Sequence, residues 1–189
     1  EAWSFPFEEA RRSFFRAYPS TTLPSFLRTL GRSAAGRKLI RDYRRAEAIA
    51  TFPRAKRRLV QSLLRENRDV KTLVFTARAD DAYAVALDNL IPVVTAEVGR
   101  AEREEILTRF RAGPLHAIAA ARVLNEGIDV PDATVAILVG GALGEREYFQ
   151  RIGRVLRPAA GKTARVVEIV TIGTLDNRRA DARWRNLAA

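Results

Sequence analysis

The sequence predicts an α/β fold: a parallel sheet with helices on both faces, preceded by a small helical region rich in basic residues. Two observations support this. From about residue 70, short runs that are apolar throughout alternate with helix-like stretches, as strands buried on both faces do. Before that point the patterned stretches are all helical. We therefore expect two regions, over 1–68 and 69–189.

Helices are expected in the first region wherever apolar residues recur every three or four positions. These stretches are "PFEEARRSFFRAY", "LPSFLRTL", "SAAGRKLIRDYRRAEAIA" and "PRAKRRLVQSLLRENR". In the last one, four apolar residues share a face: Leu59, Val60, Leu63 and Leu64. Its first turns are crowded with cations, namely Arg54, Lys56, Arg57 and Arg58. Cations oppose the dipole at a helix N-terminus, so they form either a functional surface or an ordinary solvated face.

The second region alternates strand and helix. The expected strands are "KTLVFTA", "IPVVT", "LHAIAAA", "TVAILVG" and "ARVVEIVTI". The expected helices are "DDAYAVALDNL", "GRAEREEILTRFRAG", "GEREYFQRIGRVL" and "LDNRRADARWRNL". Asp80 or Asp81 lies near the N-cap of the first of these helices, and Gly113 ends the second. In such sheets, ligands bind at the carboxyl ends of the strands.

Charge and composition indicate which partners the protein could bind and exclude several kinds of catalytic and metal site. The net charge is +11, and residues 1–68 hold 16 Lys/Arg against 6 Asp/Glu, which predicts a polyanionic partner. With no cysteine and only His116, the chain lacks a disulfide, a thiolate metal site and a histidine-based triad. We find no signal peptide or membrane span and expect a cytoplasmic protein without a membrane partner. Because it begins with Glu and has no Met, we expect a piece of a longer chain.

Two stretches imitate a phosphate-binding P-loop. Gly161-Lys162-Thr163 lacks the earlier glycine, since position 156 is Leu, and a strand pattern follows it instead of preceding it. "GRSAAGRKL" at 31–39 ends in Arg-Lys-Leu and follows no strand. We interpret the first as a turn and the second as a helix start.

Two other segments have residues suited to phosphate chemistry. In the helix expected over 147–158, the spacing of Gln150, Arg154 and Arg157 places them on the side opposite an apolar face. In "EGIDVP", Gly127 permits a tight turn and Asp129 follows in an apolar context. These segments follow neighbouring strands along the chain, so we expect them to line the same edge of the sheet.

Several motifs, in order, resemble superfamily 2 helicases. "TLVFTAR" is similar to motif IV, "AEREEILTRFRAG" to the helix after it, "VLNEGIDVP" to motif V and "QRIGRVLRP" to motif VI. Together "EGIDVPDA" and "REYFQRIGRVLRP" resemble the XPB branch, the DNA helicases of nucleotide-excision repair and transcription. The resemblance covers about 70–172, and 1–68 resembles, by pattern and charge, the helical thumb and lead-in helix of that branch.

The resemblance implies two RecA-like domains with ATP and Mg²⁺ in the cleft between them. The P-loop and the Mg²⁺-binding acidic box belong to the first domain, and this chain shows neither motif. It would therefore be the second RecA-like domain, inactive as an ATP hydrolase alone, with the N-terminal RecA-like domain of the same protein as its partner. DNA and a nuclease or repair protein are the other partners implied.

The resemblance also implies roles for individual residues. Arg157 would be the arginine finger and Arg154 its companion on the γ-phosphate, supported by Gln150 and Arg151. Gly127 and Asp129 would lie beside the ribose and couple cleft closure to DNA.

On the DNA side, the resemblance implies that Thr76 and Arg78 contact phosphates. Motif V ordinarily opens with a hydroxyl residue, whereas Ala120 and Ala121 stand here, followed by Arg122 as a substitute contact. Ala96 also replaces the usual His or Gly after "VVT".

Two alternatives stay open at this point. One is another superfamily 2 motor, such as a restriction translocase or an RNA helicase. The other is a non-catalytic nucleic-acid-binding module, against which the intact Arg154 and Arg157 argue.

Overall fold

The computed structural model describes residues 5–121, 133–140, 163–174, 176–177, 180–181 and 185. The chain divides into two compact units, Glu1–Thr51 and Phe52–Ala189. This division differs from the boundary expected near residue 68. The reason is that the helix Arg54–Glu66, labelled α4, buries Val60 and Leu63 in the same core as the sheet. Among the helices in these ranges, none combines the length and apolar character that a bilayer span requires.

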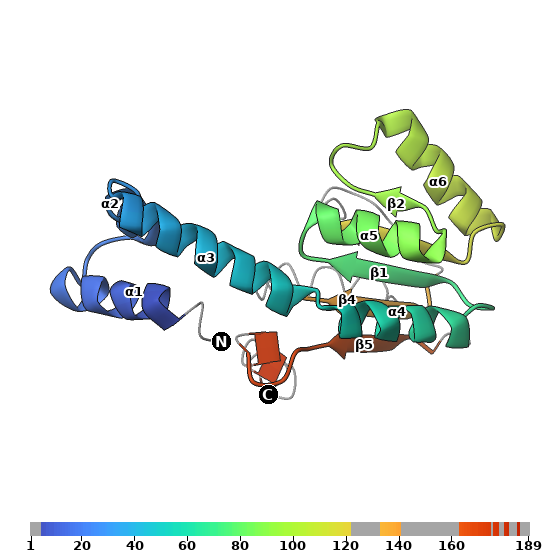
Figure 1. Ribbon diagram of the computed structural model, residues 1–189. Coiled ribbons are helices and arrows are strands. Elements are labelled where there is room, and N and C mark those ends of the chain that lie inside the picture. Colours follow the sequence, from blue (N-terminus) through green and yellow to red (C-terminus); the bar gives the residue numbers. More distant parts are fainter. Residues whose placement is uncertain are drawn as a thin grey trace. The chain divides into compact units, whose positions relative to one another are not determined.

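The first unit contains three helices, as expected: α1 (Phe5–Ala17), α2 (Leu23–Leu30) and α3 (Ala34–Thr51) (Figure 1). An aromatic cluster joins them. Phe7 of α1 stacks on Tyr43 of α3 at 4.1 Å between ring centroids and meets Phe26 of α2 edge-on at 5.6 Å. Phe7 and Phe26 are buried, so this small unit has a core of its own.

The stretch 31–39 is a helix–helix turn, which confirms its interpretation as a helix start. Gly31 ends α2, and the Ser33 hydroxyl accepts the N–H of Gly36 at 2.9 Å in the first turn of α3. A Cβ atom on Gly36 would lie 1.8 Å from the carbonyl oxygen of Leu30. The glycine is therefore required by the close approach of α2 to α3, and a helix stands where a P-loop would need a strand.

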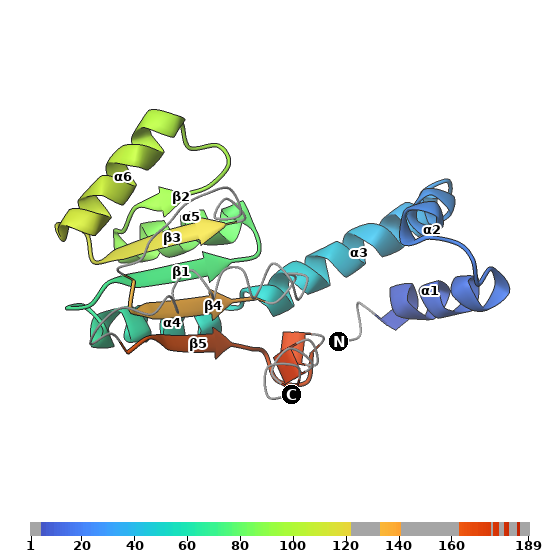
Figure 2. The same ribbon diagram turned by 180° about the vertical axis from the view of Figure 1, so that it is seen from behind.

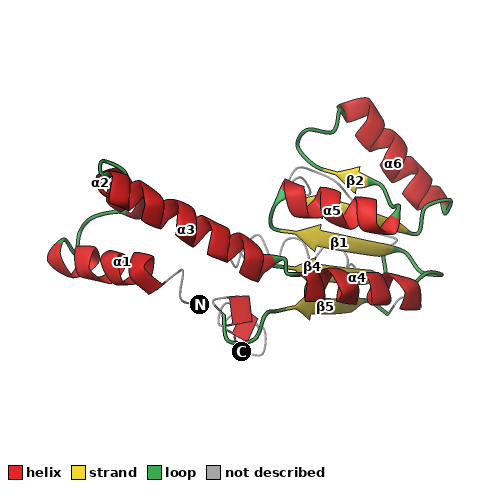
Figure 3. Ribbon diagram, viewed as in Figure 1, coloured by secondary structure: helices red, strands yellow, loops and turns green. Residues whose placement is uncertain are grey.

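The second unit is built on a parallel five-stranded sheet of order β2-β3-β1-β4-β5 (Figure 3). The strands are β1 (Thr72–Thr76), β2 (Val93–Val94), β3 (Ala117–Ala121), β4 (Val135–Val139) and β5 (Arg165–Ile169). Within residues 52–121, which the structure describes without a gap, the helices of this unit beside α4 are α5 (Ala79–Asn89) and α6 (Arg100–Ala112). The central strand β1 is buried throughout and pairs Val74 with Ala119 and Ile137. Both the α/β class and the parallel sheet are thus confirmed.

Helices cover both faces of this sheet. α4 and α5 pack together on one face, in front of the strands in Figure 1 and behind them in Figure 2. Val60 of α4 and Val85 of α5 meet Val74 and Ile137 there. On the other face, Leu107 and Phe110 of α6 pack into a core with Phe75.

Among the described residues, most expected element limits agree with the structure, and two details differ. Arg78 is the N-cap residue of α5, and Asp80 and Asp81 lie in its first turn. Leu59 does not share the buried face of α4, since its side chain is 47% exposed. It lies about 100° around the helix axis from the buried Val60, which turns it toward solvent. Of the expected C-terminal helix, the described positions 176–177, 180–181 and 185 are helical.

Candidate functional site

The carboxyl ends of the parallel strands form one edge of the sheet, and polar residues follow several of them. After β1, Thr76 is buried and its hydroxyl donates to the Arg78 carbonyl oxygen at 2.8 Å. The Arg78 side chain is exposed by 48% and donates to Asp80 at 2.9 Å. Of the two residues after β1 that were expected to contact phosphate, only Arg78 therefore presents its side chain to solvent, and Thr76 shapes the turn beneath it.

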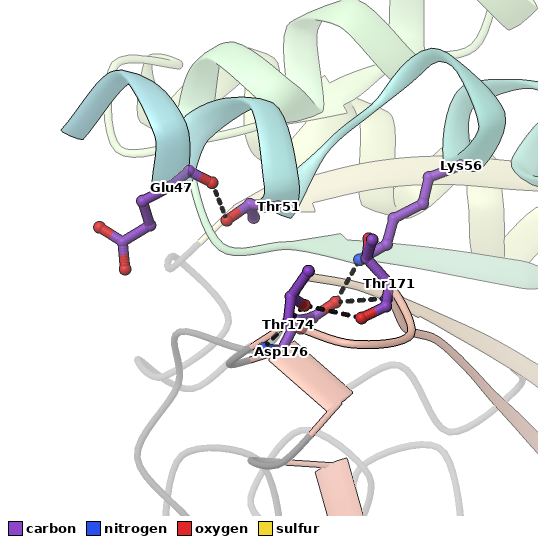
Figure 4. Close-up of polar contacts among 6 residues, drawn as sticks. All are labelled: Glu47, Thr51, Lys56, Thr171, Thr174 and Asp176. Carbon is purple, nitrogen blue, oxygen red and sulfur yellow. Dashed lines mark hydrogen bonds and ion pairs between the residues drawn. The ribbon is translucent and has the colours of Figure 1, made fainter. Parts of the chain in front are cut away.

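A buried ion pair connects two elements at this edge. The ammonium of Lys56, in the first turn of α4, donates to the carboxylate of Asp176, which follows β5 (Figure 4). Their side chains are only 3% and 8% exposed. The same carboxylate oxygen accepts the N–H of Thr171 at 3.1 Å, and Thr174 donates its hydroxyl to the Thr171 carbonyl at 2.6 Å. The pair therefore ties the start of α4 to the chain leaving β5.

Sequence reasoning missed this pair, since it counted Lys56 among the crowded cations of α4. A signal was present, because Lys56, Val60 and Leu63 recur at spacings of four and three on the face that packs against the sheet. Nothing in the local sequence pointed to Asp176, 120 residues away.

Asp81 is a second carboxylate of note at the start of α5. Burial raises the pKa of Asp81, an effect partly offset by the charges of Arg78 and Lys56, whereas Asp80 adds to it. Its Oδ2 atom is buried and has no hydrogen-bond partner in the part of the chain that the structure describes. The ionised form of Asp81 is therefore disfavoured relative to a solvated aspartate.

The turn after β2 is held by its own side chains. Thr95 is fully buried and donates its hydroxyl to Glu97 at 3.0 Å, and the Tyr83 hydroxyl lies 3.2 Å from it. Arg103 of α6 donates to the carbonyl oxygens of Thr95 and Val98 at 3.2 and 3.1 Å. This turn, where Ala96 replaces the expected His or Gly, is thus fixed between α5 and α6.

The remaining candidate residues fall outside the described ranges. They are Arg122, Gly127, Asp129, Gln150, Arg151, Arg154 and Arg157. The strands before them are described: β3 ends at Ala121 and β4 at Val139, and these strands flank β1 on either side. The segments with Asp129 and with the arginines thus follow the two strands that pair with β1, the strand that precedes Arg78. That Asp129, Arg154 and Arg157 lie at the same edge of the sheet stays a prediction.

No group of three or more His, Asp or Glu side chains suited to a metal ion occurs within the described ranges. His116 lies just before β3 and is exposed, in keeping with an ordinary position at a strand end.

Comparisons with known proteins agree with this architecture. The model of the family described as "Helicase conserved C-terminal domain" matches residues 55–159. The chain is 44% identical over 135 residues to the DNA 3'-5' translocase XPB2 of Sulfurisphaera tokodaii, covering 71% of this chain and 30% of that protein. It is 36% identical over 132 residues to the DNA 3'-5' helicase XPB of Mycobacterium tuberculosis, covering 69% and 24%.

Among solved structures, the C-terminal domain of the DEAD-box protein Dbp5 superposes with a TM-score of 0.62 at 17% identity, over 73% of this chain and 81% of that one. This likeness concerns the fold alone. The chain spans under a third of the XPB relatives named above. The family match, the parallel sheet and the order of the motifs lead to one assignment. The chain belongs to the family of helicase conserved C-terminal domains, and within it to the XPB type of superfamily 2 helicases.

Proposed function

We propose that this chain is the second motor half of an ATP-dependent DNA translocase or helicase, active in DNA repair. The observation that carries the proposal is the 44% identity to an XPB translocase, over 135 residues or 71% of this chain. In this proposal, residues 1–51 form a thumb-like region. The first motor domain, which contains the P-loop, is the main partner.

Hydrolysis develops negative charge on the γ-phosphoryl group, which arginines from across a cleft stabilise. We assign Arg157 as the finger and Arg154 as its companion, supported by Gln150 and Arg151. Gly127 and Asp129 would meet the ribose side of the nucleotide. ATP and Mg²⁺ would be held mainly by the first motor domain, with the metal neutralising phosphate charge.

On the DNA side, we propose that Arg78 contacts a backbone phosphate. Its exposure after β1 supports this role, whereas the burial of Thr76 favours a supporting role in the turn. Arg122 would add a second cation after β3. These contacts position DNA without reading its sequence.

The test is the Arg157→Ala variant of the parent protein. It should bind ATP and DNA normally and lose hydrolysis by about 10³–10⁵-fold, or roughly 4–7 kcal/mol of transition-state stabilisation. Arg109→Ala, at an exposed position of α6, is the matched control and should leave turnover unchanged. Normal turnover in Arg157→Ala would refute the assignment.

The 189-residue chain alone should show no ATP hydrolysis, because the P-loop lysine and acidic box are absent from it. Robust turnover by the purified chain would contradict the division of labour between the two motor domains. Stimulation of the parent ATPase by RNA but not by DNA would assign it to the RNA-directed motors instead.

A further inference from the structure

Much of the positive charge expected in a separate basic region belongs to the sheet unit. Residues 52–68 hold six Lys/Arg against one Glu, a net charge of +5. Three of these cations have partners in the structure: Lys56 pairs with Asp176, Arg57 donates to Asp88 of α5 at 2.6 Å, and Arg68 donates to Asp69 at 3.4 Å. Three others on α4, namely Arg54, Arg58 and Arg65, are exposed and make no hydrogen bond or ion pair with the described residues.

These three residues form a row along α4, here called the α4 arginine row. Their spacings of four and seven place them on one side of the helix, turned away from the buried Val60 and Leu63. At 1.5 Å per residue, the row is about 16 Å long. Gln61 lies between its members on the same side.

The surface beside the row is hollowed. A cavity of about 420 Å³ is lined by Arg54, Arg57, Arg58, Gln61 and Asp88. A second cavity, of about 630 Å³, shares Gln61 and Asp88 with it and continues past Arg65. Because α4 and α5 pack side by side (Figure 1), the two cavities make one trough along the arginine row.

The chemistry of the first cavity, at the Arg54 and Arg58 end of the row, fits phosphate. Every residue that lines the first cavity is polar or charged, and its one acidic member, Asp88, is engaged by Arg57. Protein partners are held by aromatic or apolar anchors in closed pockets. No such residue lines the first cavity, whereas the second cavity also has apolar residues in its wall, among them Leu64, Leu90 and Ile91. Guanidinium groups suit phosphate oxygens in their planar geometry. One strand of duplex DNA carries one phosphate per about 3.4 Å of helix axis, so a row about 16 Å long is long enough for each of its three arginines to meet a different phosphate.

We propose that the α4 arginine row binds the phosphodiester backbone of DNA, as a contact additional to those at the carboxyl edge. This rests on the proposed function for the choice of DNA as the polyanion. Cations in the first turn of α4, where they oppose the helix dipole, then have a function. The site would hold DNA on the outer side of α4, opposite the helix face that packs on the sheet.

The test compares two triple variants of the 189-residue chain, each lacking three positive charges. One replaces Arg54, Arg58 and Arg65 with Gln, and keeps Arg57 because it holds Asp88. The matched control replaces Arg100, Arg109 and Arg111 of α6 with Gln. Binding to a labelled duplex DNA is measured by fluorescence anisotropy over a salt series, with circular dichroism to verify the fold of each variant.

In the α4 variant, the slope of log affinity against log salt should fall by about 2.7, which is about 0.9 for each of three phosphate contacts. The α6 control should keep the wild-type slope. An unchanged slope in the α4 variant, or an equal loss in both, would overturn this inference and leave the proposed function intact. Loss of binding to a polyglutamate peptide with DNA binding preserved would also overturn it, in favour of an acidic protein. Absence of DNA binding by the unmodified chain would count against both proposals.

Discussion

Replacing Asp176 with Asn keeps the shape of the side chain but removes its charge, which leaves the buried Lys56 ammonium without its counter-ion. The Lys56 side chain is 3% exposed, so water cannot replace the carboxylate. Breaking a buried pair on one side costs about 3–5 kcal/mol. The Asn oxygen can still accept from Lys56 and from the Thr171 N–H, and Asp81 adds a distant negative charge. We therefore expect the lower value, about 3 kcal/mol.

Urea denaturation followed by circular dichroism measures this loss as a change in the free energy of unfolding, with a constant m value as the check for two-state behaviour. The companion variant combines Lys56→Met with Asp176→Asn. Because the buried ammonium is gone, the volumes are kept and the amide oxygen still accepts the Thr171 N–H, it should recover most of the stability that Asp176→Asn alone loses. The reasoning is refuted if Asp176→Asn costs under about 1 kcal/mol, which is the range of a solvent-exposed pair.

Two further predictions concern the same unit. Because burial raises the pKa of Asp81 above its ordinary value of 3.8, the folded protein binds that proton more tightly, and stability falls as pH rises through the interval between the two values. Above this pH interval, the Asp81→Asn variant should therefore have a larger free energy of unfolding than the wild type, whereas below it the difference should not depend on pH. A difference in stability that is the same at every pH would contradict the raised pKa of Asp81. Phe110→Ala, at a fully buried position, should cost about 3–5 kcal/mol through the cavity it leaves, whereas Leu87→Ala, at a position 77% exposed, should cost under about 0.5 kcal/mol. Equal losses in urea denaturation of the two variants would show that α6 does not pack as described.

The order of elements could be predicted because it depends on local patterns. Each residue of "TLVFT" is either β-branched or large and apolar, and the segment forms a strand buried at all five positions. Gly113 ends α6 with φ of 101°, a conformation that glycine adopts without a steric penalty. The motifs that resemble superfamily 2 helicases were also readable by themselves, since their residue types and spacing lie within short segments.

The boundary near residue 68 could not be predicted in this way. α4 reads as one more basic helix after three others, and its membership in the sheet unit depends on the contacts of Val60 and Leu63 with strands that follow it. Leu59 shows the same limit, because periodicity ranks neighbouring apolar residues alike and only packing decides which one is covered.

The sequence by itself determined the α/β class, the alternation of strands and helices, and the helicase motifs, because hydrophobic period and turn residues act over a few positions. Tertiary structure decided which cations are held and which are exposed. Lys56 and Arg58 stand two residues apart, yet one is buried against Asp176 and the other faces solvent. That difference arises from the direction each side chain takes around α4 and from a carboxylate 120 residues along the chain, which only the folded sheet brings to it.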